Sequence, residues 1–289
     1  MKLITLLLLL ISLSVPALGQ AAVEGWAVEG AFGAEKNSGP DRFAVGKDYV
    51  NKVGALPHLA FGGGWKTILV ATNISSKPAK AKIEVVDPSG KFMTVSLRRA
   101  DTGQVIQGSQ FTITLMEGGT LSLILEGGGE TKTGWIWYAT VPASSDPAYG
   151  GVIAIHEVFR AAIPGRADLE AVVLPDSALD RKFIAPFDNT GGFRTAIALA
   201  NSNTGDPVSI TVTIRDEDGA LLGTRTDRLD IGFQRAFQTD EVWPETRNRR
   251  GTILITASHS MLASLTLIFN PTGAMTTSQF YGISETSGN

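Results

Sequence analysis

The sequence predicts an all-β protein built of two tandem antiparallel β-sandwich domains of immunoglobulin-like type that arose by internal duplication. Three observations predict this fold class. Apolar and polar residues alternate over short segments, turn residues separate these segments, and several motifs recur in the same order in both halves. No long stretch shows the apolar periodicity of a helix.

Residues 1–19 are interpreted as a secretory signal peptide. Lys2 supplies the positive start, an apolar run follows, and Ala17 and Gly19 are the small residues that a signal peptidase reads. The run is too short to cross a bilayer, which takes roughly 20 apolar residues. Gln20 stands where a lipoprotein would need cysteine. We therefore expect an exported protein, periplasmic or extracellular, without a lipid anchor or an integral membrane span.

Removal of the signal leaves about 270 residues, which suggests two domains at roughly 100–200 residues each. We place them at 57–174 and 183–285, with a polar and charged linker at 175–182. Residues 20–56 have no counterpart in the second copy. They are interpreted as a flexible lead or as an added edge strand.

The composition excludes several classes of function. The chain has no cysteine, which excludes disulfides, thiol catalysis and thiolate metal sites. Its 25 basic and 28 acidic residues give a formal net charge of -3, so no nucleic-acid partner is expected. The basic cluster at 247–250 lies between a proline and a glycine and is interpreted as a solvated turn.

The duplication is predicted from matched segments. They are "GGWKTILVATN" (63–73) with "GGFRTAIALAN" (191–201), "PAKAKIEVVDPSG" (78–90) with "PVSITVTIRDEDG" (207–219), "GWIWYA" (134–139) with "GTILIT" (251–256), and "VFRAAIPG" with "IFNPTG". Matches in the same order along both halves indicate one repeated unit.

The elements within each repeat follow from the period-two pattern. In "VSITVTIR" (208–215) apolar and polar residues alternate, which predicts a strand with one buried and one solvated face. The turns at 87–90 and 216–219 begin with Asp and end with Gly, as in type I turns followed by a residue of positive φ. Each turn leads into another β-rich run, "KFMTVSL" or "ALLGTRT", so both are predicted to be hairpins.

The segment "FGGGWKT" (61–67) suggests a phosphate-binding loop, but three features favour the start of a strand. Trp65 occupies the place of the glycine that precedes the lysine in such a loop, and a β run rather than a helix follows. The second copy replaces Lys66 with Arg194. We predict that Trp65 and its counterpart Phe193 lie on the face that points into each sandwich.

Catalytic and metal sites are not predicted with specificity. The three histidines, His58, His156 and His259, have no histidine at the equivalent position of the other copy, so no catalytic residue is assigned. Acidic residues cluster at the second turn, where a solvated hairpin tip is favoured and Asp216 and Asp218 are weak calcium candidates. No cofactor is expected.

The aromatic strand "GWIWYA" differs most between the copies. Ile136 and Tyr138 match the apolar pair of the second copy and are predicted to face the core, so Trp135 and Trp137 face outward. Two adjacent exposed indoles would form a ligand platform for a sugar ring or an apolar partner. The alternatives are cover by the N-terminal segment or the second domain, and a wrong assignment of the two faces.

These motifs resemble the tandem immunoglobulin-like or fibronectin type III-like modules of secreted bacterial proteins. More closely, the repeated "GGW/F-K/R-T…N" and "PG/PTG" elements look like those of uncharacterised exported bacterial proteins, over about residues 57–285. The resemblance implies a sandwich module that binds, spaces or scaffolds, and it carries over no functional residues. We therefore expect a non-catalytic interaction or scaffold protein with surface proteins or polysaccharide as partners. The alternatives are a carbohydrate-binding module that uses Trp135 and Trp137, and an exported hydrolase with an unrecognised site.

Overall fold

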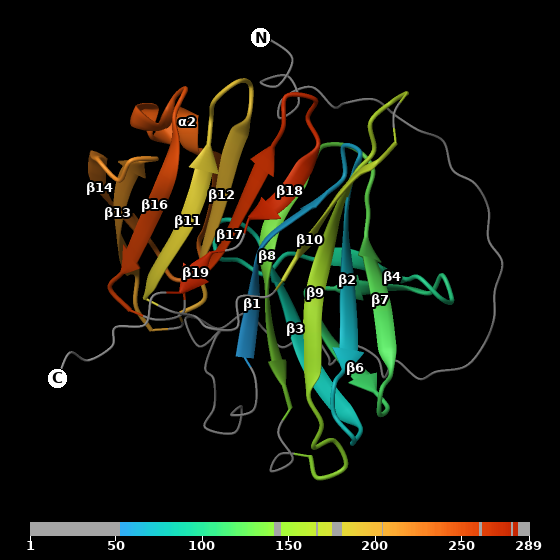
Figure 1. Cartoon of the computed structure of the whole chain (residues 1–289). Helices are drawn as coiled ribbons and strands as arrows, with labels where there is room; N and C mark the ends of the chain where they lie inside the picture. Colours follow the sequence, from blue (N-terminus) through green and yellow to red (C-terminus); the bar gives the residue numbers. More distant parts are fainter. Residues whose placement is uncertain are drawn as a thin grey trace.

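The structure is a computed structural model that describes residues 53–141, 146–165, 167–174, 181–203, 205–259, 262–278 and 280–282. The predicted signal peptide at 1–19, residues 20–52 and most of the predicted linker lie outside the described residues. All strand pairs within the described ranges are antiparallel and form four sheets (Figure 1). None of the helices in these ranges has the length and apolar character needed to cross a membrane.

The first half contains two sheets that face each other across one apolar core. The four-stranded sheet has the order β1 (Val53–Phe61), β8 (Lys132–Thr140), β3 (Ala79–Val86) and β6 (Gln110–Leu115). The six-stranded sheet has the order β10 (Leu169–Val173), β9 (Ile153–Ala161), β2 (Trp65–Asn73), β7 (Thr120–Leu125), β4 (Val95–Arg99) and β5 (Val105–Gly108). Strand β1 begins at Val53, ahead of the predicted start of the first repeat at residue 57.

The second half has the same sandwich-like arrangement with its own core. One sheet has the order β14 (Leu221–Leu229), β13 (Val208–Asp216), β16 (Arg250–Ala257), β11 (Lys182–Asp188) and β19 (Tyr281–Gly282). The other has the order β15 (Gln234–Gln238), β12 (Arg194–Asn201), β17 (Leu262–Phe269) and β18 (Met275–Ser278). Two short helices, α2 (Thr239–Val242) and η2 (Pro244–Thr246), connect β15 to β16.

The strand orders of the two halves correspond. The order β1-β8-β3-β6 matches β11-β16-β13-β14, and β10-β9-β2-β7 matches β18-β17-β12-β15. The first half carries β4 and β5 beyond β7, whereas β15 has no strand on its outer side within the described part of the second half. This difference leaves an edge open in the second half.

One threonine of the repeated segment makes the same hydrogen bonds in both halves. The hydroxyl of Thr67 bonds both backbone groups of Ala60, and the hydroxyl of Thr195 bonds both backbone groups of Asp188. These side-chain bonds tie the first strand of each half to the second strand.

The asparagine that ends the repeated segment is buried in both halves. The side-chain amide nitrogen of Asn73 lies within 3.2 Å of the carbonyl oxygens of Lys77, Leu115 and Met116. That of Asn201 lies within 3.3 Å of the carbonyl oxygens of Asp206, Leu229 and Asp230. Each asparagine therefore holds together loops that meet at one end of its half of the chain.

The predicted turns have the expected chemistry. One carboxylate oxygen of Asp87 accepts the N–H groups of Ser89 and Lys91, and one of Asp216 accepts those of Asp218 and Ala220. The glycines that end the two turns, Gly90 and Gly219, have φ of 80° and 82°. A residue without a Cβ adopts this conformation without steric cost.

The predicted hairpin extends along two full strands in the second half, whereas in the first half it is limited to the residues next to the turn, where Val86 and Phe92 form an antiparallel bridge. Strands β13 and β14 pair as expected. In the first half β4 crosses to the other sheet and pairs with β7, and β3 pairs with β6 instead. The alternation in "KFMTVSL" sets which side chains of β4 face the core, but it carries no information about the strand that β4 joins.

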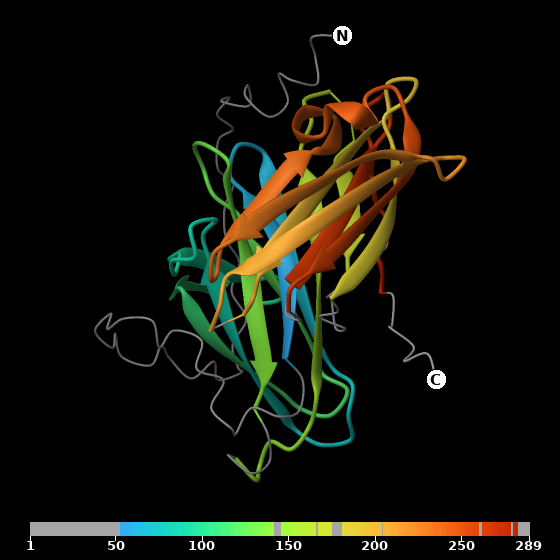
Figure 2. The same ribbon diagram turned by 90° about the vertical axis from the view of Figure 1, so that its left-hand side faces the viewer.

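An apolar interface joins the two halves, which lie side by side in both views (Figures 1 and 2). We call this interface the seam. One of its clusters contains Ala55, Val86, Trp135, Trp137, Ala139, Ala200 and Ala263, and the other contains Phe159, Ala161, Ala171, Val173, Ala198, Leu265, Leu267 and Met275. Both clusters combine residues from the two halves, so the sheet of β12 and β17 is buried on both faces.

Candidate functional site

The segment "FGGGWKT" starts a strand, as predicted. Strand β2 begins at Trp65, directly after a turn in which Gly62, Gly63 and Gly64 have φ of 79°, 58° and 90°. Lys66 forms a surface ion pair with Glu126 at 3.0 Å. The prediction for Phe193 is wrong, because this residue precedes β12 in the turn and is 38% exposed.

The two tryptophans of β8 do not form an exposed platform. The face assignment is confirmed, because Ile136 and Tyr138 lie in the core of the first half while Trp135 and Trp137 lie in the seam. The second half covers both indoles, whose exposed fractions are 0% and 7%, so the alternative of cover by the second domain is confirmed. The interpretation of the pair as a sugar-binding surface is therefore wrong, since the rings are inaccessible to a ligand.

Hydrogen bonds fix the seam around Trp135. Its indole Nε1 donates to the carbonyl oxygen of Gly232 at 2.8 Å. The Gln234 side-chain amide donates to the carbonyl oxygen of Pro57 at 3.3 Å and lies 2.7 Å from His58 Nδ1. Since an amide nitrogen is a donor, His58 Nδ1 accepts, and burial lowers the pKa of His58 to about 4. His58 is therefore neutral at physiological pH and has a structural role.

The other polar residues singled out from the sequence also serve the fold. The carboxylate of Asp216 is bound to the N–H groups of its own turn, while the side chain of Asp218 is exposed. Within the described residues no group of three or more acidic, histidine or cysteine side chains is arranged to hold a metal ion. His259 Nε2 lies 3.0 Å from the carbonyl oxygen of Pro207 in a loop contact.

Glu157 on β9 is an ionisable residue that sequence reasoning missed. Its side chain is fully buried opposite Leu69 on β2 and Val173 on β10, and neither carboxylate oxygen has a hydrogen-bond partner among the described residues. Burial raises the pKa of Glu157 well above its usual value. A signal was present in the sequence, because Glu157 stands in the apolar positions of the alternating strand "IAIHEVFRA".

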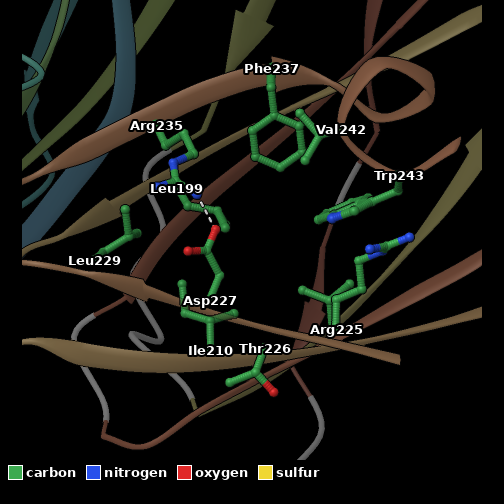
Figure 3. Close-up of a pocket in the computed structure, with 11 residues that line it drawn as sticks. Leu199, Ile210, Arg225, Thr226, Asp227, Leu229, Arg235, Phe237, Val242 and Trp243 are labelled. Atoms are coloured by element: carbon green, nitrogen blue, oxygen red, sulfur yellow. Dashed lines mark hydrogen bonds and ion pairs between the residues drawn. The ribbon is translucent and has the colours of Figure 1, made fainter. Parts of the chain in front are cut away.

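The described surface is hollowed between β14 and β15, which are edge strands of the two different sheets of the second half. We call this hollow the cleft; it has a volume of about 220 Å³ (Figure 3). It is lined by Leu199, Ile210, Val212, Arg225, Thr226, Asp227, Leu229, Arg235, Phe237, Val242 and Trp243. The aliphatic residues of β12 and β13 that line it belong to the core of the second half, so the cleft opens directly onto that core.

Aromatic residues form part of the wall of the cleft, and ion pairs lie at its rim. The rings of Phe237 and Trp243 meet edge to face at 4.9 Å. Arg235 of β15 pairs with Asp227 of β14 at one end of the cleft (Figure 3), and Arg225 holds both carboxylate oxygens of Glu245 at 2.8 and 2.9 Å. The Arg225 guanidinium lowers the pKa of Glu245. An apolar interior with a charge-balanced rim can accept an uncharged aliphatic or aromatic group.

The sequence contains one sign of the cleft. Between the turn that follows β13 and the central strand β16 the second half is shorter than the equivalent part of the first, and this stretch, described throughout, contains no strands that correspond to β4 and β5. A missing pair of strands exposes the edge that they would cover.

No family model matches the chain, and neither a curated protein nor a solved structure shows significant similarity to it.

Proposed function

We propose that the chain is an exported, non-catalytic interaction or scaffold protein. In this proposal two immunoglobulin-like β-sandwich modules, derived from one ancestral unit, form a single rigid body. The seam fixes their relative position, and the cleft supplies a surface for a partner.

Matched structural detail supports the duplication. The two halves share their strand order, the contacts of Thr67 and Thr195, and the carbonyl-binding role of Asn73 and Asn201. Independent origin would have to reproduce each of these features in the same order along the chain.

The seam is the observation that carries the scaffold proposal. It buries Trp135 completely, and hydrogen bonds cross it in both directions, from Trp135 to the carbonyl oxygen of Gly232 and from the Gln234 amide to the carbonyl oxygen of Pro57. Interfaces between domains of one chain allow relative motion unless they are large and hydrophobic. This seam is apolar in both of its clusters, which favours one rigid body.

A distance measurement between the halves tests rigidity. Because the chain has no cysteine, Met116→Cys and Asp218→Cys place one spin label on each half at exposed positions. We expect pulsed electron paramagnetic resonance to give a single narrow distance distribution. The additional substitution Trp135→Ala should broaden it, whereas Phe193→Ala, outside the seam, should leave it unchanged. A broad distribution in the otherwise native protein would contradict the proposal.

Export is tested separately by the mass of the secreted chain. We expect cleavage after Gly19 to leave Gln20 as the first residue of the mature protein. Recovery of the full-length chain in the cytoplasm alone would refute export.

A further inference from the structure

We propose that the cleft binds an extended peptide segment of a partner protein. The segment pairs with β15 as an added strand and places branched aliphatic side chains in the cavity. This inference rests on the proposed interaction function and names the class of ligand.

The first half shows what occupies the equivalent position. Strand β7 pairs with β2 so that Leu123 lies opposite Leu69, and β15 pairs with β12 so that Phe237 lies opposite Ile197. The backbone N–H of the buried asparagine donates at the start of each pair, to Gly119 in one half and to Phe233 in the other. Strands β7 and β15 therefore have the same register.

Strand β4 covers the outer edge of β7. Leu97 and Arg99 of β4 pair with Leu125 and Leu123, and the side chains of Val95 and Leu97 fill the core of the first half. No described strand takes this position beside β15, and the cleft lies there instead. In this register the counterpart of Leu125 is Thr239, so the place that Leu97 takes in the first half falls where β15 ends and α2 begins. Val242 and Trp243, which follow there, line the cavity.

The edge of β15 presents backbone groups to a new strand. The N–H of Gln234 donates to the carbonyl oxygen of Pro88 at 3.1 Å, so it points away from β12. Backbone groups of alternate residues in a strand point in the same direction, so the N–H and C=O of Ala236 also face the open edge.

The same edge already carries a strand-type contact between the halves. Ser89, at the tip of the turn after β3, forms an antiparallel bridge with Phe233. A ligand strand along Ala236 would continue this interface toward Val242 and Trp243. Peptides recognised by strand addition gain affinity from backbone hydrogen bonds and specificity from pockets for alternate side chains.

The size and charge of the cleft suit this ligand. Pockets for small molecules commonly measure roughly 300–1,000 Å³, which exceeds the volume of about 220 Å³ found here. The arginines of the rim are paired with Asp227 and Glu245, so a charged side chain would find no free counter-ion there. Uncharged branched side chains match the Phe237, Val242 and Trp243 wall.

The test uses the intact mature protein and a fluorescein-labelled peptide with the sequence of residues 94–100, TVSLRRA, the strand that covers β7. Fluorescence anisotropy measures binding. A control peptide carries Val95→Asp and Leu97→Asp. We expect the control peptide to bind at least tenfold more weakly.

Two protein variants separate occupation of the cavity from strand pairing. Val242→Asp places a charge in the cleft wall, and Ala236→Pro removes the outward N–H from an edge where proline is tolerated. Both should weaken binding at least tenfold. The matched control is Val172→Asp on the edge strand β10, since Val172 and Val242 are 48% and 42% exposed. If Ala236→Pro does not fold, peptides methylated at single backbone nitrogens test the same hydrogen bonds from the ligand side.

Three results would overturn the inference: no binding of TVSLRRA, equal binding of the control peptide, or binding insensitive to Val242→Asp and to loss of backbone hydrogen bonds. A dimer that Val242→Asp disrupts would assign the cleft to a second copy and would also overturn it. A narrow distance distribution without peptide binding removes this inference and leaves the scaffold proposal standing.

Discussion

The indole nitrogen of Trp135 in the first half donates a 2.8 Å hydrogen bond to the carbonyl oxygen of Gly232 in the second half. The side chain is fully buried, so both halves together enclose a residue that lies outside either core. The bond connects residues 97 positions apart in the sequence. It is therefore a direct link across the seam between the two halves.

Replacement of Trp135 with Phe should lower the free energy of unfolding by about 1–3 kcal/mol. The ring remains apolar, but the carbonyl oxygen of Gly232 loses its buried donor. Denaturant unfolding of the parent and the variant measures the difference. Trp65→Phe is the control, because Trp65 packs at the border of the seam and is only partly buried. Equal losses for the two variants would argue against a specific role of this bond.

Glu157 should make stability fall as pH rises. Below its ordinary pKa of about 4.5 the carboxyl is protonated in both the folded and the unfolded chain. Above that pH only the unfolded chain releases the proton, since burial raises the pKa of Glu157 in the folded state. The contribution of Glu157 to the free energy of unfolding is therefore fully present below its pKa in the unfolded chain. It is lost as the pH rises through its pKa in the folded chain.

The variant Glu157→Gln isolates this effect. Its gain in unfolding free energy over the parent should be near zero at pH 4 and should increase toward pH 8. Urea unfolding at several pH values measures the difference, in which the titration of His58 cancels. A gain that does not depend on pH would show that burial does not raise the pKa of Glu157 in the folded protein.

The two buried asparagines should be equally sensitive to substitution. Asn73→Ala and Asn201→Ala each leave buried carbonyl oxygens without a donor, and each should lower the free energy of unfolding by about 1–3 kcal/mol. Thermal or urea unfolding provides the measurement. Asn203→Ala serves as control, because that side chain makes an exposed bond to Gly205. A large loss at only one of the two asparagines would contradict the equivalence of their roles.

Substitution of alanine should destabilise the protein at two glycines, because the backbone of a neighbouring strand lies close to each of them. A Cβ at Gly134 would lie 2.3 Å from the carbonyl oxygen of Val86, and one at Gly251 would lie 2.0 Å from that of Arg215. We expect each substitution to cost about 1–3 kcal/mol. Gly128→Ala, where a Cβ meets no atom within 4 Å, should change stability little. The melting curves of the three variants, each compared with that of the parent, measure these changes in stability.

The sequence predicted the local elements well where one face of a strand is buried. The alternation of β13 and the Asp–Gly turns gave strands and turns with the expected glycine conformations. It also separated the two faces of β8 correctly. Between an exposed and a covered Trp135 and Trp137 the alternatives stayed open, although "WIWYA" is apolar on both faces, which is typical of a strand covered on both sides. The run "AIALA" of β12 carries the same signal.

The sequence contains only an indirect sign of the cleft, and it does not show which strand β4 joins. Whether β4 joins β3 or β7 depends on pairing between strands that are distant along the chain, and both partners would bury Val95 and Leu97. The open edge of β15 follows from the absence of such a strand among the described residues of the second half.

The sequence by itself determined the all-β class, the alternating faces of the strands and the turn geometry, because these depend on the pleat and on φ at single residues. Only the tertiary structure decided what covers the outward faces. Trp135 is buried because the second half lies against it, and the cleft beside Phe237 stays open because no strand of the described chain covers β15. Contacts of this kind join residues far apart in the chain. The alternation of apolar and polar residues along a single strand contains no information about them.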